Sequence, residues 1–574
     1  MRDCLRTLLP MLLLLSVQGC VHPDARTETT PLAPPGTYPS ESVEGRNGMV
    51  VSVSEPASAV GVSILKQGGN AVDAAVATAF ALVATYPPAG NLGGGGFMLV
   101  HPAPGEGDPT AFIYRETAPA SARPGMFAKE DSQYTHRAVA TPGTVRGLAL
   151  VHRRFGTLPW AQLIAPAVAL ARDGFPIDTN LASSLNETLA KATDSAEFRR
   201  VFGKPGGGPW NPGDRLTQPD LARTLQLLAD LGPEAFYTGP IADALVDEMA
   251  RGKGLITHRD LADYRALERK ALTTRYRGEY DVYVPPPPSA GGICLLEELN
   301  MIEAFDLKAW GRWSPELFHV MAEVMRRAQY DRARYLGDPD FVDIPRRLTT
   351  PEYGRRLART IDLRKAGRSE PLPAVRPPSR EEQCTTHLSV IDRRGMAVAN
   401  TYTLERLWGS RVVVKNRGFL LNNNMFGFNL FPGETDASGI GNTIAPGKRM
   451  LSSQTPTIVA RDGRVKLVTG TPGTRAIPNT ILCLMVNLID FEMPLQAALE
   501  APRFSHEWIP DQISFETPER YPELVKALGA LGHTVVRTGP RPQGDAHTIW
   551  VIEPNRYVGV ADRRRSDKAS AAGY

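Results

Sequence analysis

The chain has 574 residues, an apolar fraction of 42% and a formal net charge of +4 at pH 7. This length and apolar content are sufficient for a large buried core, so the chain is globular. The small net charge and the scattered basic residues argue against a nucleic-acid-binding protein and against a polybasic membrane surface. We expect small or peptide-like partners and no nucleic acid.

The first twenty residues, "MRDCLRTLLPMLLLLSVQGC", have the pattern of an export signal. Two arginines precede an apolar stretch from Leu8 to Val17 that is too short to cross a bilayer. The "SVQG" before Cys20 resembles the cleavage box of bacterial lipoproteins, whose cysteine is acylated. We expect residues 1–20 to be a lipoprotein signal and Cys20 to carry lipid, which places the protein in the periplasm or on a membrane. The alternative is ordinary signal cleavage somewhere before the Pro- and Thr-rich stretch "HPDARTETTPLAPPGTYPS".

Residues 21–46 are rich in proline and threonine and are expected to form a flexible tether. The pattern then changes to a short strand, a helix that ends at Gly68, and an Ala-rich helix that begins near Asn70. The run Gly93–Gly96 leads into another strand. It lacks the Lys-Ser/Thr of a phosphate-binding loop, so we expect it to permit close backbone packing.

Residues 130–350 have mainly helical patterns, interrupted by the proline-rich "VYVPPPPSAGG". After Gly367 the chain becomes irregular and polar, "GRSEPLPAVRPPSREE", which is typical of an exposed segment that can be cut. The five cysteines include no closely spaced pair of the kind found in metal or redox motifs. We expect no disulfide framework.

The pattern of residues 385–403 predicts a β-hairpin, with "THLSVI" and "MAVANTYT" on either side of the turn "DRRG". Thr385 then lies opposite Tyr402 if the loop has four residues, or opposite Thr403 if it has three. A hydroxyl nucleophile needs a base, and a free α-amino group, with a pKa near 8 in model peptides, can serve on the same residue. Cleavage between Cys384 and Thr385 would create both groups. We expect His387 to be a structural strand residue, because no G-x-S-x-G elbow accompanies it.

A series of motifs in a fixed order resembles one enzyme family. They are "GMVVSVSEPAS", "GGNAVDAA", "AGNLGGGGFM", "YRETAPA", "PPPPSAGGICLLEELNMIEAFDL", "TTHLSVID", "GFLLNNNM", "LSSQTPTIV", "VTGTPGT" and "APRFSHEW". Through them, residues 47–574 resemble the gamma-glutamyltransferase family, also called glutathione hydrolases. The resemblance implies an α/β (α+β) fold, the four-layer αββα sandwich of N-terminal nucleophile hydrolases. It also implies a precursor that cuts itself into a large subunit, 47–384, and a small catalytic subunit, 385–574.

The resemblance also implies roles for residues that match the family's motifs. Thr385 matches the nucleophile, and Thr403 matches the threonine that hydrogen-bonds the nucleophile. Gly473 and Thr474 stand where backbone N–H groups form the oxyanion hole. Three further residues match positions that bind the substrate's α-carboxylate: Arg115, Ser452 and Ser453. For the arginine this role suits a planar guanidinium, which can bind a carboxylate through two hydrogen bonds.

The chain departs from the family's pattern around the substrate's α-ammonium. Gly427 replaces the aspartate that binds this group, and Asn424 replaces a glutamine or glutamate in the same motif. Glu405 replaces an asparagine and could supply a carboxylate to the same pocket. Thr474 replaces the second glycine of the oxyanion motif, so a side chain crowds the N–H. Loss of a buried charge partner costs about 3 kcal/mol, so these changes bear chiefly on specificity.

The sequence therefore predicts a self-cleaving enzyme without metal or organic cofactor. It would hydrolyse or transfer the γ-glutamyl group of glutathione and related amides through an acyl-enzyme on Thr385, with water or an amino acid as acceptor. The two subunits would remain together as a heterodimer. One alternative is an amidase of altered acyl specificity, a glutaryl or cephalosporin-type acylase, which Gly427 favours. Another is a non-catalytic peptide-binding lipoprotein.

Overall fold

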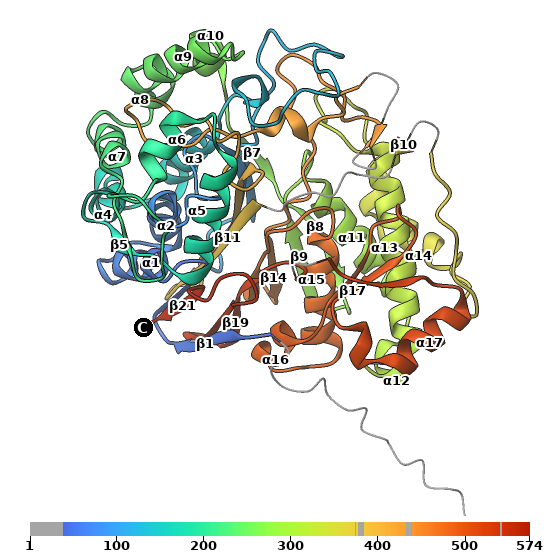
Figure 1. The fold of residues 1–574 in the computed structure, drawn as a ribbon. Coiled ribbons are helices and arrows are strands. Elements are labelled where there is room, and N and C mark those ends of the chain that lie inside the picture. The colour runs from blue at the N-terminus through green and yellow to red at the C-terminus, as the bar shows by residue number, and fades with distance from the viewer. Residues whose placement is uncertain (1–37, 373–374, 377–383, 432–434, 437–438, 540–541) are drawn as a thin grey trace, which may run out of the picture.

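The computed structural model describes residues 38–372, 375–376, 384–431, 435–436, 439–539 and 542–574. Two sheets are stacked in the centre, and helices cover the outer face of each one (Figure 1). Helices, sheet, sheet and helices therefore form four layers, which confirms the predicted αββα sandwich.

The first sheet holds the predicted hairpin at its centre. Its strands, in order, are β21 (Ser570–Gly573), β2 (Gly48–Ser52), β11 (Cys384–Asp392), β12 (Ala397–Glu405), β3 (Gly95–His101), β4 (Thr110–Ile113) and β7 (Leu267–Lys270). All neighbouring strands are antiparallel. The hairpin strands are thus flanked on both sides, and both of their faces are buried.

The second sheet is also antiparallel throughout. Its strands, in order, are β1 (Ser40–Gly45), β20 (Arg556–Asp562), β19 (His547–Glu553), β15 (Arg464–Thr469), β14 (Thr457–Arg461), β9 (Tyr280–Val284) and β8 (Leu272–Tyr276). Apolar side chains from both sheets meet between them, for example Leu99 and Ile391 from the first and Ile458 from the second. This interior fixes the sheets face to face.

The tether predicted for residues 21–46 is wrong at its C-terminal end. Ser40–Gly45 forms the edge strand β1, which pairs with β20 along its whole length. Val43 packs against the cluster between the sheets, so the alternating "SESVEG" buries its apolar member. The remainder of the tether up to residue 37, together with the signal and Cys20, lies outside the described residues.

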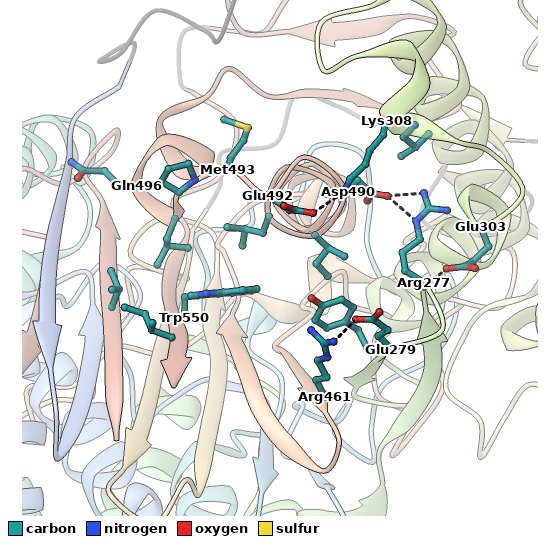
Figure 2. Close-up of a pocket in the computed structure, with 18 of the residues that line it drawn as sticks. Arg277, Glu279, Glu303, Lys308, Arg461, Asp490, Glu492, Met493, Gln496 and Trp550 are labelled. Atoms are coloured by element: carbon teal, nitrogen blue, oxygen red, sulfur yellow. Dashed lines mark hydrogen bonds and ion pairs between the residues drawn. The ribbon is translucent and has the colours of Figure 1, made fainter. Parts of the chain in front are cut away.

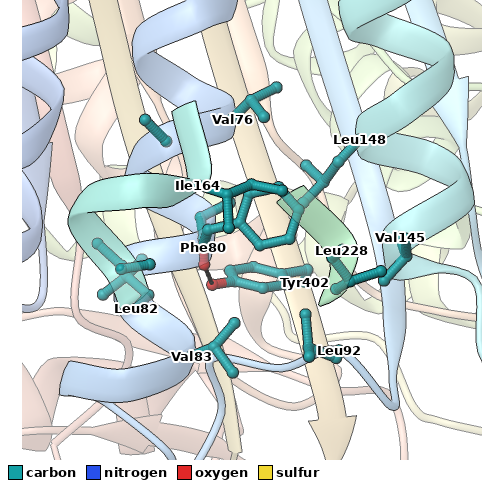
Figure 3. Packing of buried hydrophobic residues seen from close by; sticks show 14 of the residues in the cluster. Val76, Phe80, Leu82, Val83, Leu92, Val145, Leu148, Ile164, Leu228 and Tyr402 are labelled. Carbon is teal, nitrogen blue, oxygen red and sulfur yellow. Dashed lines mark hydrogen bonds between the residues drawn. The ribbon is translucent and has the colours of Figure 1, made fainter. Parts of the chain in front are cut away.

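Helices of the large subunit region cover the first sheet. They are α1 (Glu55–Lys66), α2 (Ala71–Thr85), α3 (Thr144–Phe155), α4 (Trp160–Asp173), α7 (Pro219–Leu231), α8 (Glu234–Tyr237) and α9 (Pro240–Gly252). Figure 3 shows Phe80 of α2 packed beside Tyr402 of β12. The Tyr402 hydroxyl donates to the Ala79 carbonyl at 3.0 Å, which ties the buried helix to the hairpin.

The helices over the second sheet come from both halves of the chain. They are α11 (Ala290–Ile302), α13 (Pro315–Tyr335), α15 (Ile477–Met485), α16 (Leu495–Glu500) and α17 (Pro522–Leu531). Two further helices pack around Trp408, namely α5 (Thr179–Lys191) and α6 (Ala196–Phe202). Because α11 and α13 precede residue 384 and the others follow it, this layer joins the two predicted subunits.

Shorter elements connect the layers. They are η1 (His136–Ala138), β5 (Phe175–Pro176), β6 (Arg215–Leu216), α10 (His258–Asp263), α12 (Leu307–Trp310), η2 (Arg346–Thr349), α14 (Pro351–Ala358), β10 (Val375–Arg376), η3 (Asn424–Gly427), β13 (Thr435–Asp436), the π-helix η4 (Val486–Asp490), β16 (Phe504–His506), β17 (Ile513–Phe515), η5 (Pro518–Arg520) and β18 (Val535–Arg537). Among the described residues, no helix has both the length and the apolar character needed to cross a membrane.

Local sequence explains the elements around the hairpin. The Asn70 side chain caps α2 by accepting from the Val72 and Asp73 N–H groups, and Asp73 accepts from the Asn70 N–H in return. The glycine run permits close backbone packing, as predicted. A Cβ at Gly94 would lie 2.1 Å from the Thr403 carbonyl oxygen. No larger residue fits there without moving β12.

Candidate active site

Thr385 lies at the head of β11, at the point where the hairpin begins. Its Cα partner on β12 is Thr403, and the register is shifted by a bulge between Cys384 and Thr385. Ile391 pairs with Ala397, and the Asp392 N–H bonds to the Met396 carbonyl at 3.0 Å. The loop therefore has three residues, and of the two registers predicted for the hairpin the structure has the one that places Thr403 opposite Thr385.

The two threonine hydroxyls are in contact. The Thr385 hydroxyl donates to Thr403 Oγ1 at 3.3 Å, and the Glu405 N–H donates to the same oxygen at 2.8 Å. Thr385 is 8% exposed, so the residue is largely shielded from solvent. Because Thr403 is held by a backbone N–H, its oxygen is fixed as a partner for the Thr385 hydroxyl.

His387 is held inside the sheet rather than at Thr385. Its Nδ1 lies 2.8 Å from Thr401 Oγ1 and its Nε2 lies 3.0 Å from Ser389 Oγ. Burial holds the pKa of the His387 imidazole well below its usual range. Both ring nitrogens are thus occupied by strand hydroxyls, which supports the structural role predicted for this residue.

The predicted oxyanion residues approach from the second sheet. Gly470 follows β15 and is packed so closely on His387 that a Cβ there would lie 2.3 Å from the imidazole ring. Side chains at 385 and 387 lie on one face of β11, so the loop that leads to Gly473 and Thr474 begins on the side of the strand that bears Thr385. No hydrogen bond joins Thr385 to Gly473 or Thr474 among the described residues.

Arg115 reaches the same end of the hairpin from the segment after β4. It is 1% exposed, and its guanidinium forms ion pairs with Glu116 at 3.2 Å and with Glu405 at 3.1 Å. Glu405 is the Cα partner of Cys384 and has a φ of 82°, which is uncommon for a residue with a side chain. Within the described region Arg115 Nε has no hydrogen-bond partner, although it is buried. The arginine thus offers an unused donor beside the hairpin.

Glu116 is a member of this cluster that the sequence analysis missed. Its carboxyl is fully buried, pairs with Arg115 and accepts a hydrogen bond from Asn424 Nδ2 at 2.6 Å. Burial raises the pKa of Glu116 to about 7, although the Arg115 charge opposes the shift. Its position directly after Arg115 in "YRETAPA" could have indicated that Glu116 belongs to the same cluster. The carboxyl therefore changes its charge near neutral pH.

Two hydrogen-bond acceptors lie close to Gly427. A Cβ at Gly427 would lie 3.6 Å from Asn424 Oδ1, 3.7 Å from the Glu405 carboxyl carbon and 3.2 Å from Met450 Cγ. Asn424 Oδ1 is buried and has no hydrogen-bond partner among the described residues. Asn424 Oδ1 can therefore accept a further hydrogen bond beside Gly427.

Ser452 and Ser453 belong to a segment that runs beside the one bearing Arg115. Thr117 forms a β-bridge with Arg449, three residues before Ser452. The Ser452 N–H donates to the Pro288 carbonyl at 3.0 Å, and Ser453 Oγ accepts from Arg332 at 3.3 Å. The serines are therefore fixed between α11, α13 and the Arg115 segment.

Two predicted positions are described only in part or not at all. Cys384 is placed as the first residue of β11, but its side chain lies outside the described part of the structure. Cys20, the predicted lipidation site, lies outside the described residues.

A large cavity lies away from these residues. It has a volume of about 1210 Å³ and contains none of the predicted site residues. Figure 2 shows Trp550 on its floor and charged side chains on its rim. The rim charges are already paired, as in Arg277–Asp490 at 2.7 Å and Lys308–Glu492 at 2.6 Å. The cavity's described lining residues include no nucleophile with an adjacent base, so the cluster around Thr385 remains the candidate active site.

One group of side chains has the composition of a metal site. The potential ligand atoms of His319, Glu323 and His533 lie within 4.8 Å of one another and are buried. The two imidazoles are hydrogen-bonded directly at 2.7 Å, and Glu323 is paired with Arg326 and Arg327. Because the atoms are already satisfied and two guanidinium charges flank the carboxylate, the group does not suit a cation.

Comparisons with known proteins agree with this geometry. A sequence profile described as Gamma-glutamyltranspeptidase matches residues 57–572. The chain is 42% identical over 561 residues to the "Glutathione hydrolase proenzyme" of Escherichia coli (strain K12), covering 95% of this chain and 96% of the relative. It is 36% identical over 548 residues to the "Acylase ACY 1 proenzyme" of Pseudomonas sp. (strain V22), covering 92% and 93% respectively.

A solved structure matches the whole fold. The crystal structure of cephalosporin acylase from Bacillus halodurans superimposes with a TM-score of 0.82 at 26% identity, covering 95% of this chain and 99% of that one. The profile match and the E. coli relative both span nearly the whole described chain. The chain therefore belongs to the gamma-glutamyltranspeptidase family of enzymes.

Proposed function

We propose that this enzyme is a self-cleaving N-terminal threonine hydrolase that hydrolyses or transfers γ-glutamyl groups. The observation that carries the proposal is the contact of the Thr385 and Thr403 hydroxyls at 3.3 Å, at the head of β11 and directly after a bulge. The donors would be glutathione and related γ-glutamyl amides. The E. coli and Pseudomonas relatives are both named proenzymes, which supports a processed chain.

The first reaction is cleavage of the chain. The Thr385 hydroxyl attacks the Cys384 carbonyl carbon, its proton leaves, and the C–N bond breaks as the Thr385 nitrogen takes up a proton. Water then hydrolyses the ester and leaves Cys384 as a carboxylate and Thr385 with a free amine. The bulge between these residues supports this step, because it interrupts strand pairing at the bond to be cut.

The second reaction uses the new amine. It accepts the proton of the Thr385 hydroxyl, which attacks the γ-carbonyl of the donor and forms an acyl-enzyme after the amine or peptide leaves. Backbone N–H groups at Gly473 and Thr474 would stabilise the oxyanion, a contribution worth about 10²–10³ in kcat for one donor in other enzymes. Water or an amino acid then takes the acyl group. Every step uses groups of the chain and the substrate.

Substrate recognition rests on opposite charges at the end of the hairpin. The donor's α-carboxylate would bind Arg115, with Ser452 and Ser453 as further partners. Its α-ammonium would lie beside Gly427 and bind the Glu405 carboxylate and Asn424 Oδ1. Both acceptors lie within 4 Å of a Cβ built at Gly427, and Asn424 Oδ1 has no other partner in the described structure, which supports an ammonium subsite.

Gly427 favours a second candidate, an acylase that removes a dicarboxylic acyl group without an amine. Position 427 supplies no carboxylate of its own, and Glu405 is already paired with Arg115 at 3.1 Å. If Glu405 stays on the arginine, the subsite is neutral and an ammonium loses its partner. The acylase names of two similar proteins also favour this candidate.

The two candidates are separated by turnover of γ-glutamyl-p-nitroanilide and glutaryl-p-nitroanilide. We predict that the wild-type enzyme prefers the γ-glutamyl compound, and that Glu405→Gln lowers its kcat/KM by roughly a hundredfold while the glutaryl compound is little affected. Gly427→Asp adds a carboxylate beside Glu405 and Asn424 and should raise γ-glutamyl turnover. Faster glutaryl turnover by the wild type, unchanged in Glu405→Gln, would replace the first candidate with the second.

We also propose that the protein is exported and held at a membrane by lipid on Cys20. The support is the short apolar stretch from Leu8 to Val17 and the small residues before the cysteine. A mature large subunit that begins at Cys20 and is heavier by its acyl groups would establish this. Cleavage at another position would favour ordinary secretion instead.

A further inference from the structure

Positive charge is concentrated in one short segment, residues 346–368. It contains eight basic and two acidic residues, a net charge of +6, whereas the whole chain has a net charge of +4. The rest of the chain is therefore slightly acidic, at −2. We expected the basic residues to be scattered along the chain, and this expectation is wrong for residues 346–368.

The basic side chains of this segment are exposed and mostly form no ion pair, although the guanidinium groups of Arg347 and Arg356 lie over the Tyr353 ring, 5.6 and 4.8 Å from its centroid. All eight are exposed. Arg355 pairs with Glu352 at 2.9 Å. Within the described residues, no ion pair is formed by Arg346, Arg347, Arg356, Arg359, Arg364 or Arg368. Surface arginines without carboxylate partners leave their charge available to an external anion.

The backbone of the segment is fixed, so these charges form a defined surface. The segment begins with η2 and α14, and α14 packs against α11 so closely that a Cβ at Gly354 would lie 2.5 Å from Asn300 Cβ. Its later part is bonded to α13: the Asp362 carbonyl lies 2.8 Å from His319 Nε2, and the Gly367 N–H donates to Glu323 at 2.9 Å. The arginines are thus presented outward from a rigid backbone.

An apolar side chain stands within this basic surface. Leu363 is 50% exposed and is followed by Arg364. Arginine suits phosphate because its planar guanidinium forms two parallel hydrogen bonds and is weakly hydrated. A basic surface with an exposed leucine matches an interface in which phosphates lie above hydrocarbon.

We propose that residues 346–368 form a docking surface for the phosphate head groups of an anionic lipid membrane. Charge complementarity selects an anionic partner, and Leu363 favours lipid over nucleic acid, whose phosphate backbone offers no hydrocarbon layer for it to enter. An anionic membrane attracts this basic surface and weakly repels the slightly acidic remainder of the chain, so the protein would orient with this surface toward the membrane. The proposal does not depend on the acyl-transfer chemistry or on lipid at Cys20.

The test is sedimentation of the purified mature enzyme with two kinds of vesicle, pure phosphatidylcholine and phosphatidylcholine containing phosphatidylglycerol. An acyl anchor binds both kinds, whereas the basic surface binds the anionic kind and releases it at high salt. The test variant is Arg359→Gln, Arg364→Gln and Arg368→Gln combined. The control combines Arg123→Gln, Arg153→Gln and Arg393→Gln, which removes the same charge from exposed positions elsewhere.

We expect the extra binding to anionic vesicles to fall roughly a hundredfold in the test variant and to persist in the control. Anilide turnover should stay at the wild-type level in both, which shows that the variants are folded. Equal binding to both vesicle types by the wild type, or an equal loss in test and control variants, would overturn the proposal. So would binding to a DNA duplex without binding to anionic vesicles.

Discussion

A single arginine, Arg115, connects the proposed recognition and catalytic parts of the site. Arg115 contacts Glu405, the residue that lies opposite Cys384, and Glu116, which is fully buried. Burial raises the pKa of Glu116 to about 7. Below this pH the Glu116 carboxyl is neutral, so it no longer competes with an incoming carboxylate for the Arg115 guanidinium. Above it the ionised carboxyl competes with the substrate for the same guanidinium.

We therefore predict that KM for a γ-glutamyl donor rises as pH increases through about 7, and that Glu116→Gln flattens this rise. The Thr385 amine should instead control kcat, since free α-amino groups titrate near 8. Glu523→Gln, on the exposed side of α17, is the control. Steady-state kinetics across neutral pH provide the measurement. An identical KM profile in wild type and Glu116→Gln would remove Glu116 from substrate recognition.

The hairpin is the element that local sequence predicts best. Alternating residues and the turn "DRRG" limited the partner of Thr385 to Tyr402 or Thr403, because register in a hairpin follows from loop length, and the structure selects Thr403. The glycine run was also predicted, since its residues must let strands approach closely. The cluster around Arg115 was predictable only through resemblance. Arg115 and Glu405 are 290 residues apart, and no local pattern records that contact.

The run Gly93–Gly96 packs closely on β12, so a side chain added in this run should disturb the hairpin. A Cβ at Gly94 would lie 2.1 Å from the Thr403 carbonyl oxygen, so Gly94→Ala must displace the residue that holds Thr385. We expect a loss of about 1–3 kcal/mol in stability and slower chain cleavage. Gly529→Ala in α17 is the control, because no atom lies within 4 Å of its Cβ. Thermal melting that is unchanged in Gly94→Ala would contradict this close contact.

Over the whole molecule, the two predicted subunits share one helical layer, and polar contacts cross between them. His319 of α13 is hydrogen-bonded to His533 at 2.7 Å, and Arg326 pairs with Asp511 at 3.1 Å. These contacts join residues before and after position 384. The sequence predicted subunits that remain together, but the buried histidine pair arises from distant segments and could not be predicted locally.

This histidine pair makes the assembly sensitive to acid. Burial, followed by the nearby His319 and Arg326, lowers the pKa of His533 from 6.5 to about 4. Between these values the separated, unfolded chain binds a proton that the folded protein excludes. Stability is therefore full above pH 6.5 and falls as pH drops toward 4, by about 3 kcal/mol in total.

We predict that His533→Gln weakens this loss of stability between pH 6.5 and 4 without removing it, because burial also lowers the pKa of His547 to about 4. Size-exclusion chromatography of the cleaved enzyme over this range measures subunit separation. The uncut Thr385→Ala chain is the matched control, since its halves stay covalently joined. A wild type and a His533→Gln variant that separate at the same pH would rule out His533 as a contributor.

The central claim is that Thr385 is the nucleophile that cuts the chain and then carries the acyl group. The intact mass of the purified wild-type protein, compared with that of Thr385→Ala, tests it most directly. We predict two fragments in the wild type, meeting between Cys384 and Thr385, and one uncut chain in the variant. A single uncut chain in both proteins would contradict the mechanism and leave a non-catalytic peptide-binding protein as the better account.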